Sequence, residues 1–288
     1  MRAYYSLKHS LKQLRWRWRR GRVAARWGAE ELAAAPVVIG NAMPKSGSHL
    51  ITQVLEGLTE LGPFVDPGFP PVTRFEDNTN LPESAVLANL QRLRPGDIVY
   101  GYLHAKEPFL SALTRPGVAT IFVSRDPRDV IVSHVFYAAD MYPGHGMHTY
   151  YNQVLDSMEA RIDAAICGVT EPDYELSPIL TKYQAYLDWL KQPAVLSMRF
   201  EDLILEREQA LNRILDYLET RGFTPQVSRA EAVATLAAGI APRKSGTFRK
   251  GQPGNWREHF TPANIATFKA ETGDLLQRLD YEKDADWS

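Results

Sequence analysis

A buried strand that runs directly into a glycine-containing turn and then a helix most limits how this chain can fold. Residues 36–43 are apolar and β-branched, as in a strand that is covered on both faces. The turn Pro44-Lys45-Ser46-Gly47-Ser48 follows, and apolar residues then recur at helical spacing from Leu50 to Leu58. A strand, a tight turn and a helix in this order begin a β-α-β unit.

The rest of the chain repeats this alternation. Further buried strands are expected over 97–103, 118–123 and 194–199. Helices are expected between and after them, including 150–165 and 262–281, and Asp126 is placed to cap a helix that starts at Pro127. Strands that alternate with helices indicate an α/β fold of three layers, a parallel sheet with helices on both faces.

Composition is compatible with such a fold and narrows the alternatives. The 288 residues are 44% hydrophobic, which is enough for a substantial core. The single cysteine, Cys167, excludes an intrachain disulfide. No apolar run approaches the roughly 18–20 residues of a membrane span. No linker long enough to divide residues 31–288 is present, so we expect one domain there.

Charge is distributed unevenly, which sets the N-terminal segment apart. The chain has 33 basic and 34 acidic residues, yet residues 1–27 hold nine Lys or Arg and no acid. We therefore expect a basic amphipathic arm over 1–30, followed by the domain 31–288. One helical stripe of this arm is apolar: Leu7, Leu11, Leu14 and Trp18. The sequence leaves open whether the stripe packs on the domain or contacts an anionic membrane, whereas nucleic-acid binding is not expected.

Distinctive polar residues follow three of the expected strands. In an open parallel sheet, ligands bind outside the carboxyl ends of the strands, and Lys45, His104 and Arg125 come directly after strands. The turn at Lys45 would aim backbone N–H groups at an anion, and the helix dipole would add to the attraction. The turn differs from the standard NTPase loop because Pro44, not Gly, precedes the lysine.

The turn Pro44–Ser48 resembles the phosphosulfate-binding loop of sulfotransferases that use 3′-phosphoadenylyl sulfate (PAPS). Two further segments resemble the other signatures of this family and occur in the same order. The second is Arg125-Asp126-Pro127, with Ser133 eight residues after the arginine. The third is Phe248-Arg249-Lys250-Gly251, followed by Gly254-Asn255-Trp256. Over roughly residues 36–282 the chain therefore resembles PAPS-dependent sulfotransferases of the cytosolic type, which implies a P-loop-like nucleotide-binding fold.

The resemblance also implies which residues bind PAPS. The residues expected to cradle the 5′-phosphosulfate are Lys45, Ser46, Gly47, Ser48, His49 and Leu50. The residues expected near the 3′-phosphate and adenine are Arg125, Ser133, Phe200, Phe248, Arg249, Lys250 and Gly251. Planar arginine side chains suit a phosphate because they can donate two parallel hydrogen bonds.

The implied reaction is transfer of the sulfuryl group from PAPS to a hydroxyl or amine by in-line displacement, with PAP as product and no metal. His104 is expected to act as the general base, and Lys45 to stabilise the transition state and the leaving group. The acceptor would be a small molecule, lipid or glycan, bound by loops that include 63–80 and 140–150. The expected location is the cytoplasm. If the arm contacts an anionic membrane, we expect it to lie at the inner membrane surface.

Two other functions remain open at this point. One is a P-loop kinase-like phosphotransferase that uses ATP and Mg²⁺, against which the Pro44-Lys45 pair argues. The other is a non-catalytic module that binds PAP, which would keep the nucleotide site without turning over any acceptor.

Overall fold

The computed structural model describes residues 2–75, 77, 79–241 and 251–288, with side chains from residue 11 onward. The chain forms two compact units. The first comprises Met1–Ser124 and Asp188–Pro242, and the second comprises Arg125–Leu187 and Arg243–Ser288.

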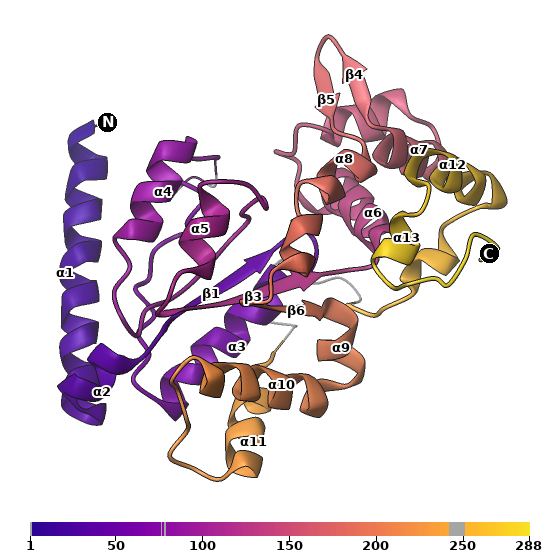
Figure 1. Ribbon diagram of the computed structural model, residues 1–288. Helices are drawn as coiled ribbons and strands as arrows, with labels where there is room; N and C mark the ends of the chain where they lie inside the picture. Colours follow the sequence, from indigo (N-terminus) through magenta and orange to yellow (C-terminus); the bar gives the residue numbers. More distant parts are fainter. Residues whose placement is uncertain (1, 76, 78, 242–250) are drawn as a thin grey trace. The chain divides into compact units, whose positions relative to one another are not determined.

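Four strands form one parallel sheet in the first unit (Figure 1). They are β1 (Val37–Ala42), β2 (Ile98–Gly101), β3 (Val118–Ser124) and β6 (Val195–Arg199). The strand order is β2-β1-β3-β6, and every neighbouring pair is parallel. Every residue of β1 and β3 is buried, which explains why these segments are apolar with little alternation. The expected parallel sheet is confirmed.

Helices cover both faces of the sheet. One face packs against α3 (Ser48–Leu61), α10 (Arg207–Thr220) and α11 (Arg229–Gly239). The other face carries α4 (Glu83–Gln91) and α5 (Phe109–Thr114). Successive residues of β3 show this division, since Ile121 lies in the core with α3 whereas Thr120 donates a hydrogen bond of 2.8 Å to the Leu113 carbonyl of α5. The arrangement is the three-layer α/β fold expected from the sequence.

The register of the sheet brings the ends of its strands to one edge. The paired positions near that edge are Asn41 with Gly101, Ala42 with Val123, and Ser124 with Arg199. Lys45 follows β1, His104 follows β2, and Phe200 begins α9 (Phe200–Leu205) after β6. Parallel strands end at the same edge, so these three residues lie along one side of the sheet.

The second unit is mainly helical. Its helices are α6 (Pro127–Phe136), α7 (Met158–Cys167), α8 (Ile179–Gln184), α12 (Pro262–Thr272) and α13 (Leu275–Arg278). It also contains an antiparallel hairpin of β4 (Val169–Glu171) and β5 (Tyr174–Leu176), which the sequence did not predict.

Two helices expected from the sequence are interrupted in the structure. A π-helical turn at Tyr150–Val154 precedes α7, which begins after Ser157; the Ser157 hydroxyl accepts a hydrogen bond from the Ala160 amide. The helix expected over 262–281 stops at Gly273, whose positive φ of 56° breaks the helical path before α13.

The N-terminal arm forms α1 (Arg2–Trp27) and α2 (Ala29–Ala34), and it packs on the first unit through a different face from the one expected. Trp16 is only 2% exposed, and its indole N–H donates to Asp97 Oδ1 at 2.9 Å. By contrast, Leu11, Leu14 and Trp18 of the apolar stripe are 48%, 60% and 60% exposed. The interpretation that this stripe packs on the domain is therefore wrong for these three residues, and the side chain of Leu7 lies outside the described ones.

The buried carboxylate of Asp97 explains why α1 packs on the first unit through the face that carries Trp16. Arg20 donates to the same Asp97 Oδ1 at 2.8 Å, and the Arg94 amide donates to Oδ2 at 2.9 Å. A buried carboxylate requires such donors, and α1 supplies two of them from the side that carries Trp16. None of the helices in the described part of the chain is both long enough and apolar enough to cross a bilayer.

Candidate functional site

The turn between β1 and α3 has a backbone suited to binding an anion. Lys45 and Gly47 both have positive φ, 69° and 96°, and a lysine in this region is uncommon. The amides of Leu50 and Ile51 donate to the Gly47 carbonyl at 2.9 and 3.0 Å. The amides before them, at the first positions of α3, have no acceptor within a helix. These donors and the positive end of the helix dipole attract an anion.

A buried hydroxyl in the same turn has no hydrogen-bond partner in the part of the chain that the structure describes. Ser46 is 0% exposed, and its Oγ makes no hydrogen bond with any residue that the structure describes. Leaving such a group unsatisfied costs about 1–3 kcal/mol. A hydroxyl in this position, beside the N-terminus of α3, fits a ligand that offers oxygen acceptors.

The ring of Phe200 restricts which residue can occupy position 47 of this turn. A Cβ atom placed on Gly47 would lie 2.5 Å from Cδ2 of the Phe200 ring. Only glycine therefore fits between the left-handed backbone and the ring. Phe200, expected beside the adenine, is in direct contact with the turn expected to hold the phosphosulfate.

The remaining residues of the turn are held in different ways. The Tyr102 hydroxyl donates to Ser48 Oγ at 3.1 Å. Partial withdrawal from water, followed by the nearby Lys45 charge, lowers the pKa of His49, so its ring is neutral near pH 7. The Leu50 side chain is 6% exposed and belongs to the hydrophobic core that α3 shares with the sheet.

The backbone next to His104 is fixed by three hydrogen bonds. The buried Asn41 side chain accepts from the Leu103 amide at 2.8 Å and donates to the Leu103 carbonyl at 3.0 Å. The indole N–H of Trp189 donates to the same carbonyl at 2.8 Å. His104 itself is exposed at the end of this anchored segment.

The surroundings of His104 favour its neutral form. Partial withdrawal from water and the charge of Lys106 lower the pKa of His104, while Glu83 opposes them. Lys106 and Glu83 also form an ion pair with each other. A neutral imidazole has a free ring nitrogen that can accept a proton.

In the second unit, Arg125 directly follows the end of β3. Its side chain is 9% exposed, and the buried Tyr183 hydroxyl donates to its carbonyl at 2.6 Å. The next residue, Asp126, caps α6 by accepting from the Arg128 amide, and Pro127 occupies the first helical turn. Both features confirm the expected start of this helix.

Asp129 connects α6 with the segment that precedes α12. Its carboxylate accepts from the Gly254 amide at 2.8 Å and from the Trp256 amide at 2.9 Å. Burial raises the pKa of Asp129, and the Arg125 charge opposes this. Ser133 lies one helical turn beyond Asp129, on the same face of α6 and half-buried. Gly251, with a φ of 59°, begins the described part of this segment.

The structure therefore describes most of the expected site residues. Those in the first unit are Lys45, Ser46, Gly47, Ser48, His49, Leu50, His104 and Phe200. Those in the second unit are Arg125, Ser133 and Gly251. Phe248, Arg249 and Lys250 lie outside the described residues.

Sequence reasoning missed three supporting residues: Asn41, Trp189 and Asp129. Asn41 and Trp189 bond to Leu103, which is 62 and 86 residues away along the chain. No local pattern reveals such contacts. The only available signal was a polar residue, Asn41, inside an otherwise apolar strand.

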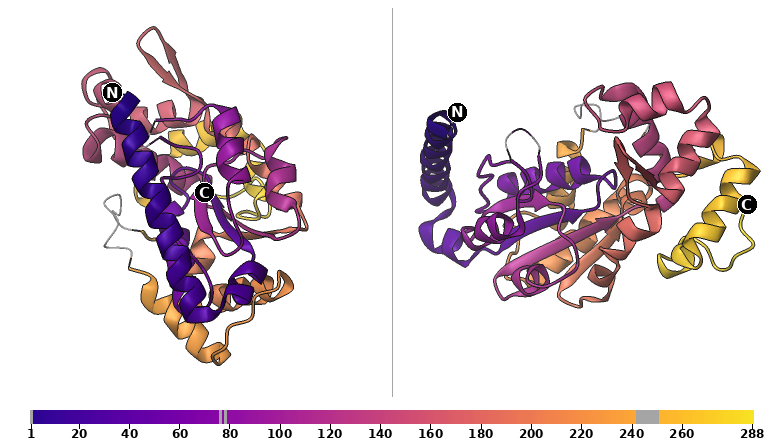
Figure 2. Two further views of the ribbon diagram at one scale, coloured as in Figure 1. Left: turned by 90° about the vertical axis from the view of Figure 1, so that its left-hand side faces the viewer. Right: turned by 90° about the horizontal axis from the view of Figure 1, so that it is seen from above.

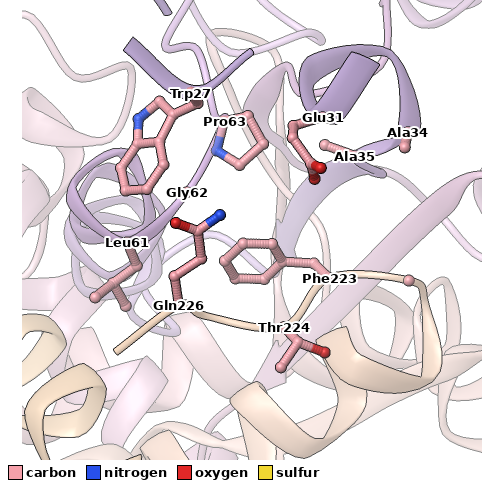
Figure 3. A pocket seen from close by; sticks show the side chains of 11 residues that line it. Trp27, Glu31, Ala34, Ala35, Leu61, Gly62, Pro63, Phe223, Thr224 and Gln226 are labelled. Carbon is pink, nitrogen blue, oxygen red and sulfur yellow. The ribbon is translucent and has the colours of Figure 1, made fainter. Parts of the chain in front are cut away.

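A small cavity in the first unit lies away from this edge of the sheet (Figure 3). It has a volume of about 40 Å³ and is lined by residues that include Trp27, Leu61 and Phe223. Leu61 ends α3, so it lies about 20 Å along the helix from the turn that follows β1. This volume is sufficient to hold a water molecule. Among the described residues, no group of three or more His, Cys, Asp and Glu side chains is placed to hold a metal ion.

Three solved structures have a similar fold. A mouse sulfotransferase, SULT7A1, complexed with PAP has a TM-score of 0.58 and 16% identity, over 89% of this chain and 91% of that chain. Retinol dehydratase with androsterone and PAP gives 0.54 and 17%, over 90% and 85%. Its complex with retinol and PAP gives 0.55 and 16%, over 88% and 83%. At these identities the likeness establishes the fold.

No curated protein sequence is significantly similar to this chain. The family model of the sulfotransferase domain matches residues 37–280, which includes the whole sheet and both sets of site residues. This match covers most of the 288 residues. The chain belongs to the sulfotransferase family.

Proposed function

We propose that this protein transfers the sulfuryl group of PAPS to a hydroxyl or amine, with His104 as general base and Lys45 as the residue that stabilises the transition state. The observation that carries this proposal is the turn at Lys45, in which a buried hydroxyl with no hydrogen-bond partner among the described residues lies beside the N-terminus of α3. Solved structures of similar fold, a mouse sulfotransferase and a retinol dehydratase, contain PAP, which supports the assignment of the nucleotide.

The turn would bind the phosphosulfate through several weak donors acting together. The first amides of α3, the Ser46 hydroxyl and the Lys45 ammonium supply hydrogen bonds and positive charge to anionic oxygens. Donors held in place before reaction need no reorganisation as charge develops, which makes them effective in catalysis. In this role Lys45 neutralises charge on the departing phosphate.

His104 would remove the proton of the acceptor. Bound PAPS supplies the electrophilic sulfuryl group, and the protein must supply an uncharged base at the same edge of the sheet. Partial withdrawal from water and the charge of Lys106 lower the pKa of His104, which favours the neutral imidazole near pH 7. Asn41 and Trp189 hold the backbone that carries it. A positioned base of this kind contributes roughly 10²- to 10⁴-fold to a rate.

The proposed acceptor is a small molecule, lipid or glycan that has a flat apolar portion. In the second unit, the rings of Tyr137 and Tyr142 stack at 5.7 Å, and His145 contacts Tyr137 edge-on at 5.8 Å. Tyr142 is 47% exposed. Exposed rings of this kind favour contact with a planar apolar group. The related retinol dehydratase structures contain androsterone and retinol.

The proposal is tested with sulfur-labelled PAPS and separate pools of small phenols and alcohols, lipids and glycans. We expect His104→Ala to lower kcat/KM by roughly 10²- to 10⁴-fold while PAP affinity is kept, and Lys45→Ala to lower both. Lys191→Ala is the matched control, because this exposed lysine forms an ion pair with Asp188 at the surface.

Three outcomes would contradict the proposal in different ways. Full transfer by His104→Ala would refute the base. Tight PAP binding without turnover of any acceptor would favour a non-catalytic module. If ATP with Mg²⁺ raised the melting temperature more than PAP does, the kinase-like phosphotransferase would be favoured instead.

A further inference from the structure

Helix α1 has two faces of opposite character. The face with Trp16 and Arg20 is bonded to Asp97. On the other side, Leu11, Leu14 and Trp18 expose about half or more of their surfaces. At 100° per residue, positions 11, 14 and 18 fall on one side of the helix, opposite Trp16. The exposed residues therefore form one continuous apolar surface rather than scattered side chains.

Basic residues surround this surface. Arg15 and Arg22 are exposed and lie on the same side of the helix, one turn from Leu11 and Trp18. The Arg22 guanidinium lies over the Trp18 ring at 4.9 Å from its centroid. The sequence of residues 1–27 contains no acidic residue to neutralise these charges.

The helix that carries this surface is held firmly by its opposite face. Besides the bonds to Asp97, Arg19 pairs with Asp66 at 3.0 Å, and Trp27 lines the cavity at the end of α3 (Figure 3). The left view of Figure 2 shows α1 along its full length, with no other element of the first unit in front of it. Leu11, Leu14 and Trp18 are thus presented on a fixed support.

We propose that this face of α1 docks on an anionic lipid bilayer. Leu11, Leu14 and Trp18 enter the interfacial region, where Trp is favoured, and Arg15 and Arg22 lie at the level of the lipid phosphates. Basic amphipathic helices bind in this way through apolar burial together with attraction to anionic lipids. This inference is independent of the proposed transfer reaction.

A second copy of the chain is a poorer occupant. A symmetric dimer through this face would place the same arginines of two copies against each other, and like charges at a contact are unfavourable. An anionic bilayer offers the opposite charge along the whole length of the surface. The positive charge of this face of α1 therefore favours an anionic bilayer over a second copy of the chain.

The test uses the full chain and vesicles of phosphatidylcholine with one quarter phosphatidylserine, compared with phosphatidylcholine alone. We expect co-sedimentation with the anionic vesicles, and a decrease of roughly tenfold or more in the double variant Leu14→Gln, Trp18→Gln. Arg15→Gln with Arg22→Gln should remove most of the preference for the anionic vesicles, as should high salt. Leu205→Gln is the matched control, since Leu205 is 70% exposed elsewhere in the first unit.

Equal binding by wild type and the Leu14, Trp18 double variant would overturn the proposal, as would wild type that does not bind the anionic vesicles. Sedimentation velocity identifies the competing occupant: a dimer that the double variant abolishes would assign the face to a second copy. PAP affinity is measured for every variant. It should be unchanged, which separates this result from misfolding and from failure of the proposed reaction.

Discussion

The charges around His104 predict the direction of its pH dependence. Its pKa is lowered by partial withdrawal from water and by the charge of Lys106, and Glu83 opposes this. Because only the neutral ring accepts a proton, kcat/KM should rise with pH through a pKa below the ordinary value of about 6.5. Lys106→Gln removes a positive charge, so it should raise the pKa of His104 and move this rise to higher pH. Glu83→Gln should move it to lower pH, and two unchanged profiles would contradict the assignment of His104.

The indole of Trp189 offers a test of positioning. Trp189→Phe keeps a ring in the core but removes the hydrogen bond to the Leu103 carbonyl, which should reduce the free energy of unfolding by about 1 kcal/mol. If this bond positions His104, kcat should also fall several-fold while PAP affinity stays constant. Urea unfolding and steady-state kinetics measure the two effects. Trp18→Phe is the matched control, and loss of stability with unchanged kcat would indicate a purely structural role.

At the level of single residues, the sequence allowed us to predict residues for the chemistry, which remain proposals, but it did not reveal the residues that hold their backbone in place. Lys45 and His104 were recognisable because each follows a strand that ends at the binding edge of the sheet. Asn41 and Asp129 act through partners 62 and 125 residues away. Such pairings depend on the completed fold, so no local pattern contains them.

Among the elements, the turn between β1 and α3 has the strictest backbone requirement. Gly47→Ala would place a methyl group 2.5 Å from Phe200 at a φ of 96°, so it should deform the turn and weaken PAP binding by at least about tenfold, or 1.4 kcal/mol. Gly117→Ala is the matched control, because its φ is 78° but nothing lies within 4 Å of the added Cβ. It should cost only the left-handed backbone penalty of about 1–2 kcal/mol and leave PAP affinity unchanged. Calorimetric titration with PAP measures both, and equal affinities would contradict the role of the turn.

The elements that could be predicted differ physically from those that could not. Strands β1 and β3 are buried along their whole length, which makes them apolar runs that the sequence reveals directly. Strands β4 and β5 have three residues each, too few to show a period of two. The helix expected over 262–281 continued the pattern through Gly273, but that residue adopts a φ of 56°. Apolar spacing alone does not show where a backbone turns.

At the scale of the whole molecule, a basic N-terminal arm precedes a domain that has a net negative charge. With nine basic residues in 1–27 and 33 basic against 34 acidic residues in all, the remainder has a net charge of about −10. We therefore expect the nucleotide to be attracted by basic residues concentrated at the ends of the strands rather than by the net charge of the domain. The division into an arm, 1–30, and a domain, 31–288, remains a proposal, since the arm also supplies Trp16 to a hydrophobic cluster with Leu32 and Val65.

Because the arm also packs on the domain through Trp16, we can predict the result of deleting residues 1–27. The deletion removes the buried Trp16 side chain, and loss of a buried tryptophan costs about 3–5 kcal/mol. It also leaves Asp97 without two of its donors, so the free energy of unfolding should fall by at least that amount. PAP affinity should be unchanged at temperatures where the shortened protein is folded, because the Lys45 turn lies at the opposite end of α3 from the helix that was removed. Urea unfolding and PAP titration measure the two quantities. Unchanged stability would contradict the packing of α1, whereas lost PAP affinity in folded protein would show that the arm contributes to the nucleotide site.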